Sequence, residues 1–194
     1  SADAAATIHA MNALFSLGLS LEEKQKIGVK LGADVPYCIM RGTALSEGIG
    51  EILTELPAPP QCHLVIAKPQ ISVSTKAVYG KLRVNELAPE EHPDIDGMMA
   101  AIKNGDLDGV IERLGNVLET VTVPDHPEIA EIKEIMVENG ASGSLMSGSG
   151  PTVFGIYKDR ELAEKACQAL READGGRLTR QVYLTEFYNR KKAR

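Results

Sequence analysis

The spacing of apolar residues predicts two helices near the start of the chain. Ile8, Met11 and Phe15 recur at three- and four-residue intervals, so they lie on one face of a helix that begins at Ser1. The sequence SLEE at residues 20–23 is a capping-box pattern, in which a serine and a glutamate satisfy each other's free backbone N–H groups. A second helix is therefore expected to begin there.

Beyond these helices, short apolar runs alternate with longer helical patterns. Strands are predicted at 43–56 (two short ones), 63–69, 143–147, 152–157 and 182–187. Helices are predicted at 75–85, 94–104, 106–121, 127–139 and 160–173. This order of elements in the second half is typical of an α+β domain with its helices on one face of a sheet.

The sequence PAPP at residues 57–60 is the clearest linker signal, because proline interrupts both helices and sheets. It predicts a boundary between a first domain at residues 1–60 and a second at residues 61–194.

Composition narrows the class of protein. Hydrophobic residues make up 43% and charged residues 25% of the 194 residues, which is typical of a globular protein. The net charge of −6 argues against a nucleic-acid partner, because such proteins neutralise phosphates with basic residues. The basic run at residues 190–194 is interpreted as a solvated tail. Apolar runs fall far short of the ~20 residues that a membrane span requires, so no membrane partner is expected.

The three cysteines, Cys38, Cys62 and Cys167, are scattered and form no CxxC pair. This argues against a zinc site or a disulfide framework and favours a cytoplasmic location.

Three segments carry candidate chemistry, and each also has a purely structural interpretation. Ser1, Ala2 and Asp3 open a small-residue helix whose free N–H groups suit a phosphate; the alternative is tight helix packing. Asp34 lies between Gly32 and a proline turn, where a fixed carboxylate could accept a hydroxyl proton; the alternative is a helix cap.

The third segment is LMSGSGP at residues 145–151, in which glycines and serines alternate between two predicted strands. Glycines allow a close approach of the backbone to a ligand, although an ordinary hairpin turn would also explain them. The segment matches neither the Walker nor the dinucleotide glycine pattern.

Taken together, SADAAA, GADVP and SGSGP resemble the GHMP small-molecule kinases, and the similarity extends over essentially the whole chain. The resemblance implies a two-domain α+β fold, in which a remnant of the N-terminal kinase α/β domain is followed by a ferredoxin-like α+β domain. It also implies ATP and Mg²⁺ as cofactors and a small-molecule alcohol as the acceptor.

The stretches IAKPQISVSTKAVY and RGTALSEGIGE are more specific to one branch of this family, and GNVLE is a further part of the resemblance. That branch phosphorylates the 2-hydroxyl of a cytidyl diphosphate of methylerythritol in non-mevalonate isoprenoid synthesis. Two sister kinase types, which act on homoserine or a mevalonate derivative, share GADVP and SGSGP. A non-catalytic ferredoxin-like binding module is the remaining alternative.

The resemblance assigns a role to each candidate residue. Asp34 is the catalytic carboxylate, and Ser1, Ala2 and Asp3 are expected to bind ATP and the metal. Thr75 and Tyr79 are expected to line the cytidine pocket, where Tyr79 stacks on the base; the alternative for Tyr79 is a place in the helix core. The family also has a glycine-rich phosphate-binding loop that ends at the start of the first helix. The residues expected to support this phosphate loop are Ser147, Gly148, Ser149 and Gly150.

The family's phosphate loop begins before the residue that matches Ser1. The resemblance therefore implies that an N-terminal segment of the protein is missing from this chain. That missing segment is expected to be a partner that the chain requires for activity. The chain alone is expected to be an incomplete and inactive portion.

Overall fold

The proline-rich segment at residues 57–60 is where the chain passes from one unit of packing to another. The computed structural model describes residues 1–188. The main bodies of the two units are Ser1–Ala58 and Pro59–Phe187. The basic run at 190–194, and with it the end of the predicted second domain, lies outside the described residues.

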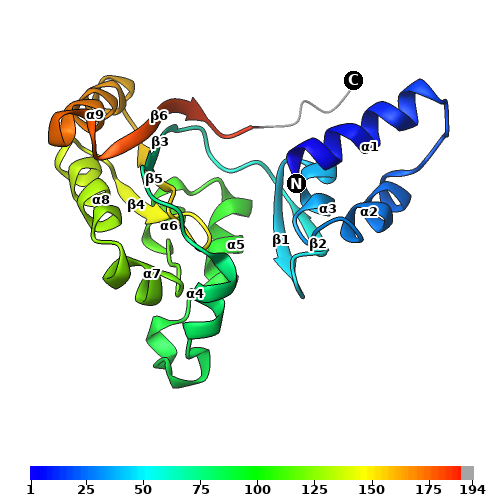
Figure 1. The fold of residues 1–194 in the computed structure, drawn as a ribbon, viewed down its shortest axis with the longest axis horizontal. Helices are drawn as coiled ribbons and strands as arrows, with labels where there is room; N and C mark the ends of the chain where they lie inside the picture. The colour runs from blue at the N-terminus through cyan, green and yellow to red at the C-terminus, as the bar shows by residue number, and fades with distance from the viewer. Residues whose placement is uncertain (189–194) are drawn as a thin grey trace. The chain divides into compact units, whose positions relative to one another are not determined.

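The first unit contains three helices and a β-hairpin (Figure 1). Its elements are α1 (Ala2–Leu14), α2 (Leu21–Val29), α3 (Val35–Met40), β1 (Thr43–Glu47) and β2 (Ile52–Leu56). The antiparallel hairpin confirms the prediction of two short strands. The core is small and is formed by Ala5 of α1 with Val35 and Ile39 of α3.

The predicted capping box is present at the start of α2. Ser20 Oγ accepts a hydrogen bond from Glu23 N at 3.2 Å, and Glu23 Oε2 accepts one from Ser20 N at 2.8 Å. At Gly28, a Cβ would lie only 2.8 Å from Ile39 Cδ1. The absence of a side chain therefore allows α2 to pack closely against α3.

Several large apolar side chains of the first unit stay exposed. Leu14 is 75% exposed, Leu31 is 64% exposed and Phe15 is 58% exposed. This unit therefore buries only part of its apolar surface within the described residues.

The second unit is built on a four-stranded antiparallel sheet with the order β4-β5-β3-β6. The strands are β3 (His63–Pro69), β4 (Gly143–Met146), β5 (Val153–Tyr157) and β6 (Thr179–Glu186). Helices connect β3 to β4, a tight loop connects β4 to β5, and one helix leads into β6 (Figure 1). This β-α-β-β-α-β connection is the ferredoxin-like arrangement that the resemblance implied.

Helices cover this sheet on both faces, whereas the sequence predicted them on one. The α-helices are α4 (Thr75–Lys81), α5 (Ile95–Asn104), α6 (Leu107–Glu112), α7 (Glu119–Asp125), α8 (Glu128–Glu138) and α9 (Arg160–Glu172). The 3-10 turns are η1 (Val84–Glu86), η2 (Pro89–Glu91) and η3 (Ala173–Gly176).

Alternate residues of β3 account for the two covered faces, because successive side chains of a strand point to opposite sides. Val65 belongs to the main core with buried residues of α8 and α9. Leu64 belongs to a separate cluster, against which Leu107 and Ile111 of α6 pack.

The helix predicted at 106–121 is broken in the structure. The chain leaves helical conformation between α6 and α7, and Asn116 lies in that connection. Its side-chain amide donates hydrogen bonds to the β4–β5 loop. Here a contact between residues distant in sequence overrides the local helical pattern. The spacing of apolar residues does not reveal such a contact.

Candidate functional site

The first group of predicted site residues lies at the start of α1. Ser1 occupies the N-cap position, its side chain makes no capping hydrogen bond, and both it and Asp3 are exposed. The first N–H groups of a helix lack partners within the helix and attract anions. The packing interpretation is confirmed for one face, because Ala5 is buried against α3, and the phosphate-binding role stays a prediction.

Asp34 directly precedes α3, and its side chain makes no capping hydrogen bond. Asp34 thus occupies the N-cap position that the capping interpretation expected, but its side chain does not act as a cap, and the residue is exposed. The two residues that follow it, Val35 and Pro36, are buried and hold the backbone in place. The arrangement leaves a carboxylate that is fixed at its backbone and free at its oxygens.

The β1–β2 turn approaches the backbone beside Asp34. Gly50 has φ +119°, and a Cβ there would lie 3.6 Å from Ala33 O. Gly50 had no role predicted from the sequence, although the RGTALSEGIGE stretch that contains it is part of the resemblance.

In the second unit, two predicted motifs that are far apart in sequence meet. Thr75 Oγ1 at the start of α4 and Ser149 Oγ in the β4–β5 loop are 2.8 Å apart and form a hydrogen bond. The loop is also a hairpin turn, since Ser147 N donates to Thr152 O at 2.8 Å and Gly150 N donates to Ser147 O at 3.0 Å. The hairpin-turn interpretation is therefore confirmed, and the role of this segment toward a ligand stays a prediction.

Tyr79 lies on α4 and is 61% exposed. The alternative that it is a helix core residue is therefore wrong, and its ring is available to a ligand. Lys81 near the end of the same helix forms a 2.5 Å ion pair with Asp125 of α7. This hydrogen bond lowers the pKa of Asp125 below its ordinary value.

Three residues that hold the β4–β5 loop were not among the residues predicted from the sequence: Asn116, Glu119 and Thr122. Asn116 and Thr122 donate to loop carbonyls, and Glu119 Oε1 accepts from Met146 N at 2.7 Å. For Asn116 and Glu119 the available signal was GNVLE at residues 115–119, which contributed to the resemblance without an assigned role, and Thr122 lies outside it.

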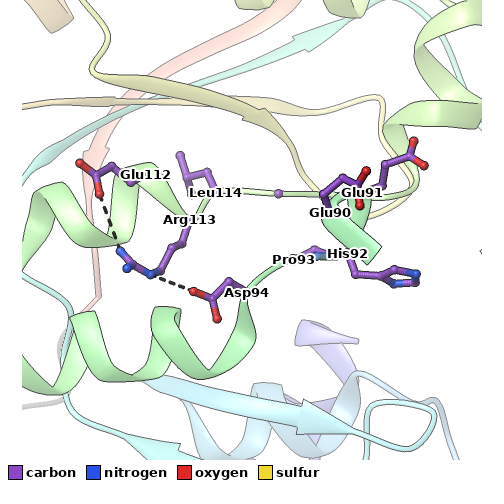
Figure 2. A pocket seen from close by; sticks show the side chains of 9 residues that line it. Glu90, Glu91, His92, Pro93, Asp94, Glu112, Arg113 and Leu114 are labelled. Atoms are coloured by element: carbon purple, nitrogen blue, oxygen red, sulfur yellow. Dashed lines mark hydrogen bonds and ion pairs between the residues drawn. The ribbon is translucent and has the colours of Figure 1, made fainter. Parts of the chain in front are cut away.

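The second unit contains a hollow of about 390 Å³, and none of its lining residues is a predicted site residue (Figure 2). It is lined by residues of two short segments, 90–94 and 112–115. Figure 2 shows Arg113 between Asp94 and Glu112, with which it forms ion pairs. Since Glu90 and Glu91 also line it, the pocket is predominantly acidic and unsuited to phosphate groups.

The donor set at the start of α1 fits Mg²⁺. Ser1 supplies a hydroxyl oxygen and Asp3 a carboxylate, both exposed. Mg²⁺ prefers oxygen ligands and commonly takes only one or two carboxylates from the protein, with substrate phosphates and water completing its shell. Among residues 1–188, no cluster of three or more His, Cys, Asp or Glu side chains is arranged to hold a metal.

All three cysteines are free, and burial makes two of them poor nucleophiles. Burial raises the pKa of the Cys62 thiol to about 11 and also raises that of Cys167. Within the described part of the chain, no helix has the length and apolar character needed to cross a membrane.

Two family models match the chain. The GHMP kinases N terminal domain matches residues 1–42, and the GHMP kinases C terminal model matches residues 98–175.

Among curated relatives, a 4-diphosphocytidyl-2-C-methyl-D-erythritol kinase of Lachnospira eligens is 54% identical over 97% of this chain. A protein of the same name from Lachnoclostridium phytofermentans is 51% identical over 98% of it. In both cases the chain spans 64% of the relative's length.

Solved structures agree on the fold. The crystal structure of a 4-(cytidine 5'-diphospho)-2C-methyl-D-erythritol kinase superposes with a TM-score of 0.76 at 29% identity, over 96% of this chain and 64% of that one. A homoserine kinase from Cytophaga hutchinsonii reaches a TM-score of 0.77 at 19% identity, over 95% of this chain and 62% of that one. The similarity to the homoserine kinase extends to the fold alone. With both family models matched and its ferredoxin-like second unit in place, this chain belongs to the GHMP kinase family.

Proposed function

We propose that the full-length protein is an ATP-dependent kinase that phosphorylates the 2-hydroxyl of 4-diphosphocytidyl-2-C-methyl-D-erythritol. The observation that carries this proposal is the identity of 49–54% to proteins of that name, over 88% or more of this chain. The proposed pathway is non-mevalonate isoprenoid synthesis, and the proposed location is the cytoplasm.

In this proposal, Asp34 orients the acceptor hydroxyl and receives its proton. The hydroxyl oxygen forms a bond to the γ-phosphorus of ATP, the bond from that phosphorus to the leaving oxygen of ADP breaks, and the proton passes to the carboxylate. Phosphoryl transfer depends mainly on positioning and charge stabilisation. An exposed carboxylate with an anchored backbone suits this role.

Ser1, Ala2 and Asp3 are assigned to the nucleotide and its metal. The backbone N–H groups at the start of α1 would hold phosphate oxygens, and the oxygens of Ser1 and Asp3 would hold Mg²⁺. When bound, Mg²⁺ neutralises negative charge that develops on the phosphates.

Thr75 and Tyr79 are assigned to the cytidyl part of the acceptor. Both are exposed on α4, and an aromatic ring at Tyr79 can stack on a pyrimidine base. Ser147 to Gly150 support the phosphate-binding part of the site in this proposal, and Ser149 does so in contact with Thr75.

The test is ADP release by the full-length protein with ATP and Mg²⁺. The acceptors are 4-diphosphocytidyl-2-C-methyl-D-erythritol, homoserine, mevalonate and galactose, and the 194-residue chain is assayed in parallel. We expect turnover with the cytidyl acceptor alone. Turnover with homoserine or mevalonate would instead assign another GHMP activity, and nucleotide binding without turnover would favour a binding module.

A further inference from the structure

The backbone of the β4–β5 loop forms hydrogen bonds with one short segment of the second unit, residues 116–122, which runs from the α6–α7 connection into α7. Asn116 Nδ2 donates to Met146 O and to Gly148 O, both at 2.8 Å. Thr122 Oγ1, on α7, donates to Ser149 O at 3.2 Å. The carbonyl groups of Met146, Gly148 and Ser149 are therefore directed toward this segment.

The orientation of the Asn116 amide is fixed by its own contacts. Its Oδ1 accepts a hydrogen bond from Leu118 N at 3.0 Å, while Nδ2 supplies the two donors that the loop carbonyls need. A flipped amide would direct its oxygen at two carbonyl oxygens and lose all three hydrogen bonds.

Glu119 fixes the point where β4 enters the loop. Its Oε1 accepts from Met146 N at 2.7 Å, and its Oε2 accepts from Lys133 Nζ at 2.6 Å. The carboxylate is thus held by a helix α8 lysine on one side and by the strand on the other.

These contacts leave one side of the loop open. Within the described part of the chain, the N–H groups of Gly148 and Ser149 donate to no protein acceptor. A Cβ built on Gly148 meets no atom within 4 Å, and Gly148 has φ +56°. Successive free N–H groups with one residue in the left-handed region form a concavity that suits an anion.

We propose that Asn116 is a positioning residue that holds this loop so that its free N–H groups receive the diphosphate of the acceptor. The inference rests on the proposed function. By fixing the loop carbonyls, Asn116 also sets the place of the Ser149 hydroxyl, which contacts Thr75 at the start of α4. The loop and the proposed cytidyl-binding helix are thereby held in one arrangement.

The test is the variant Asn116→Asp in the full-length protein, which keeps the shape of the side chain and removes both donors. We expect the KM of the cytidyl acceptor to rise about tenfold, because two loop carbonyls lose their partners and face a carboxylate. The KM of ATP should rise by a clearly smaller factor, because the loop only supports the part of the site that holds ATP, whereas its free N–H groups would contact the acceptor itself.

The matched control is Asn139→Asp. Asn139 lies in the same unit, and its Nδ2 likewise donates to a backbone carbonyl, Ile135 O, at 2.8 Å. Because that carbonyl belongs to α8, this control should leave both KM values unchanged.

If Asn116 had only a structural role, the variant would have a lower kcat in proportion to its smaller folded fraction, and both KM values would be unaltered. That result would overturn the proposal. An equal rise in both KM values would overturn it as well. If Asn116→Asp does not fold, Thr122→Val removes a single loop hydrogen bond and should raise the acceptor KM in the same selective way.

A second readout separates this inference from the proposed activity. Cytidine 5'-diphosphate is added to the ¹⁵N-labelled full-length protein, and the amide resonances of Gly148 and Ser149 are followed. Shifts in the wild type that are lost in Asn116→Asp would support the inference even if no acceptor is phosphorylated. Equal shifts in both proteins, or shifts in neither, would overturn it.

Discussion

At the residue scale, Asp34 shows which properties of a site residue the local sequence predicts and which the tertiary structure adds. The sequence placed an acid between glycine and proline and left capping and catalysis as alternatives. The structure places Asp34 at the N-cap position of α3, but the side chain makes no capping hydrogen bond. The catalytic role stays a prediction.

Asp34→Asn in the full-length protein is expected to lower kcat by about 100-fold or more, because an amide cannot accept the hydroxyl proton. Its free energy of unfolding should change by less than about 0.5 kcal/mol, since the side chain is exposed and caps nothing. Steady-state kinetics and urea unfolding measure the two quantities.

The matched control is Glu55→Gln, which neutralises another exposed carboxylate of the first unit. It should leave both kcat and stability unchanged. A near-normal kcat for Asp34→Asn would remove this residue from the mechanism.

At the element scale, signals contained within a few residues were reliable. The capping box at Ser20 and Glu23 and the hairpin strands β1 and β2 are present as predicted. The break between α6 and α7 was not predicted, because it depends on the contact of Asn116 with a loop that is 30 residues away in sequence.

The cap of α9 permits a direct test of element stability. Asp159 accepts hydrogen bonds from Glu161 N at 2.7 Å and from Leu162 N at 3.3 Å. Asp159→Ala should lower the free energy of unfolding by about 1 kcal/mol, because two N–H groups at the helix start lose their acceptor.

Asp159→Asn is the comparison, since an amide oxygen also caps a helix. It should retain most of the stability in urea unfolding at neutral pH. Equal loss in both variants would mean that the charge of Asp159, and not its hydrogen bonds, stabilises α9.

At the scale of the whole molecule, the two units differ in how much core each contains. The second unit has a continuous core that includes Val65, Ile132 and Leu170, all fully buried. The first unit has a three-residue buried cluster and exposes Leu14 and Phe15.

We therefore expect residues 59–188, produced alone, to unfold cooperatively in urea. A domain with its own core is typically stable by about 5–15 kcal/mol. Ile132→Ala in this fragment should lower the free energy of unfolding by about 2–5 kcal/mol, because it leaves a cavity in that core. A broad, non-cooperative transition in the unsubstituted fragment would show that the second unit depends on other parts of the chain.

The sequence by itself determined most of the element types, the linker, the family and the candidate residues, because caps, periodic apolar faces and glycine motifs act over short distances. Only the tertiary structure decided that Thr75 meets Ser149, that Tyr79 is exposed, and that Asn116 leaves its helix pattern to hold a loop. These outcomes depend on contacts between residues that are distant in sequence. Their free energies arise only once the sheet has brought those residues together.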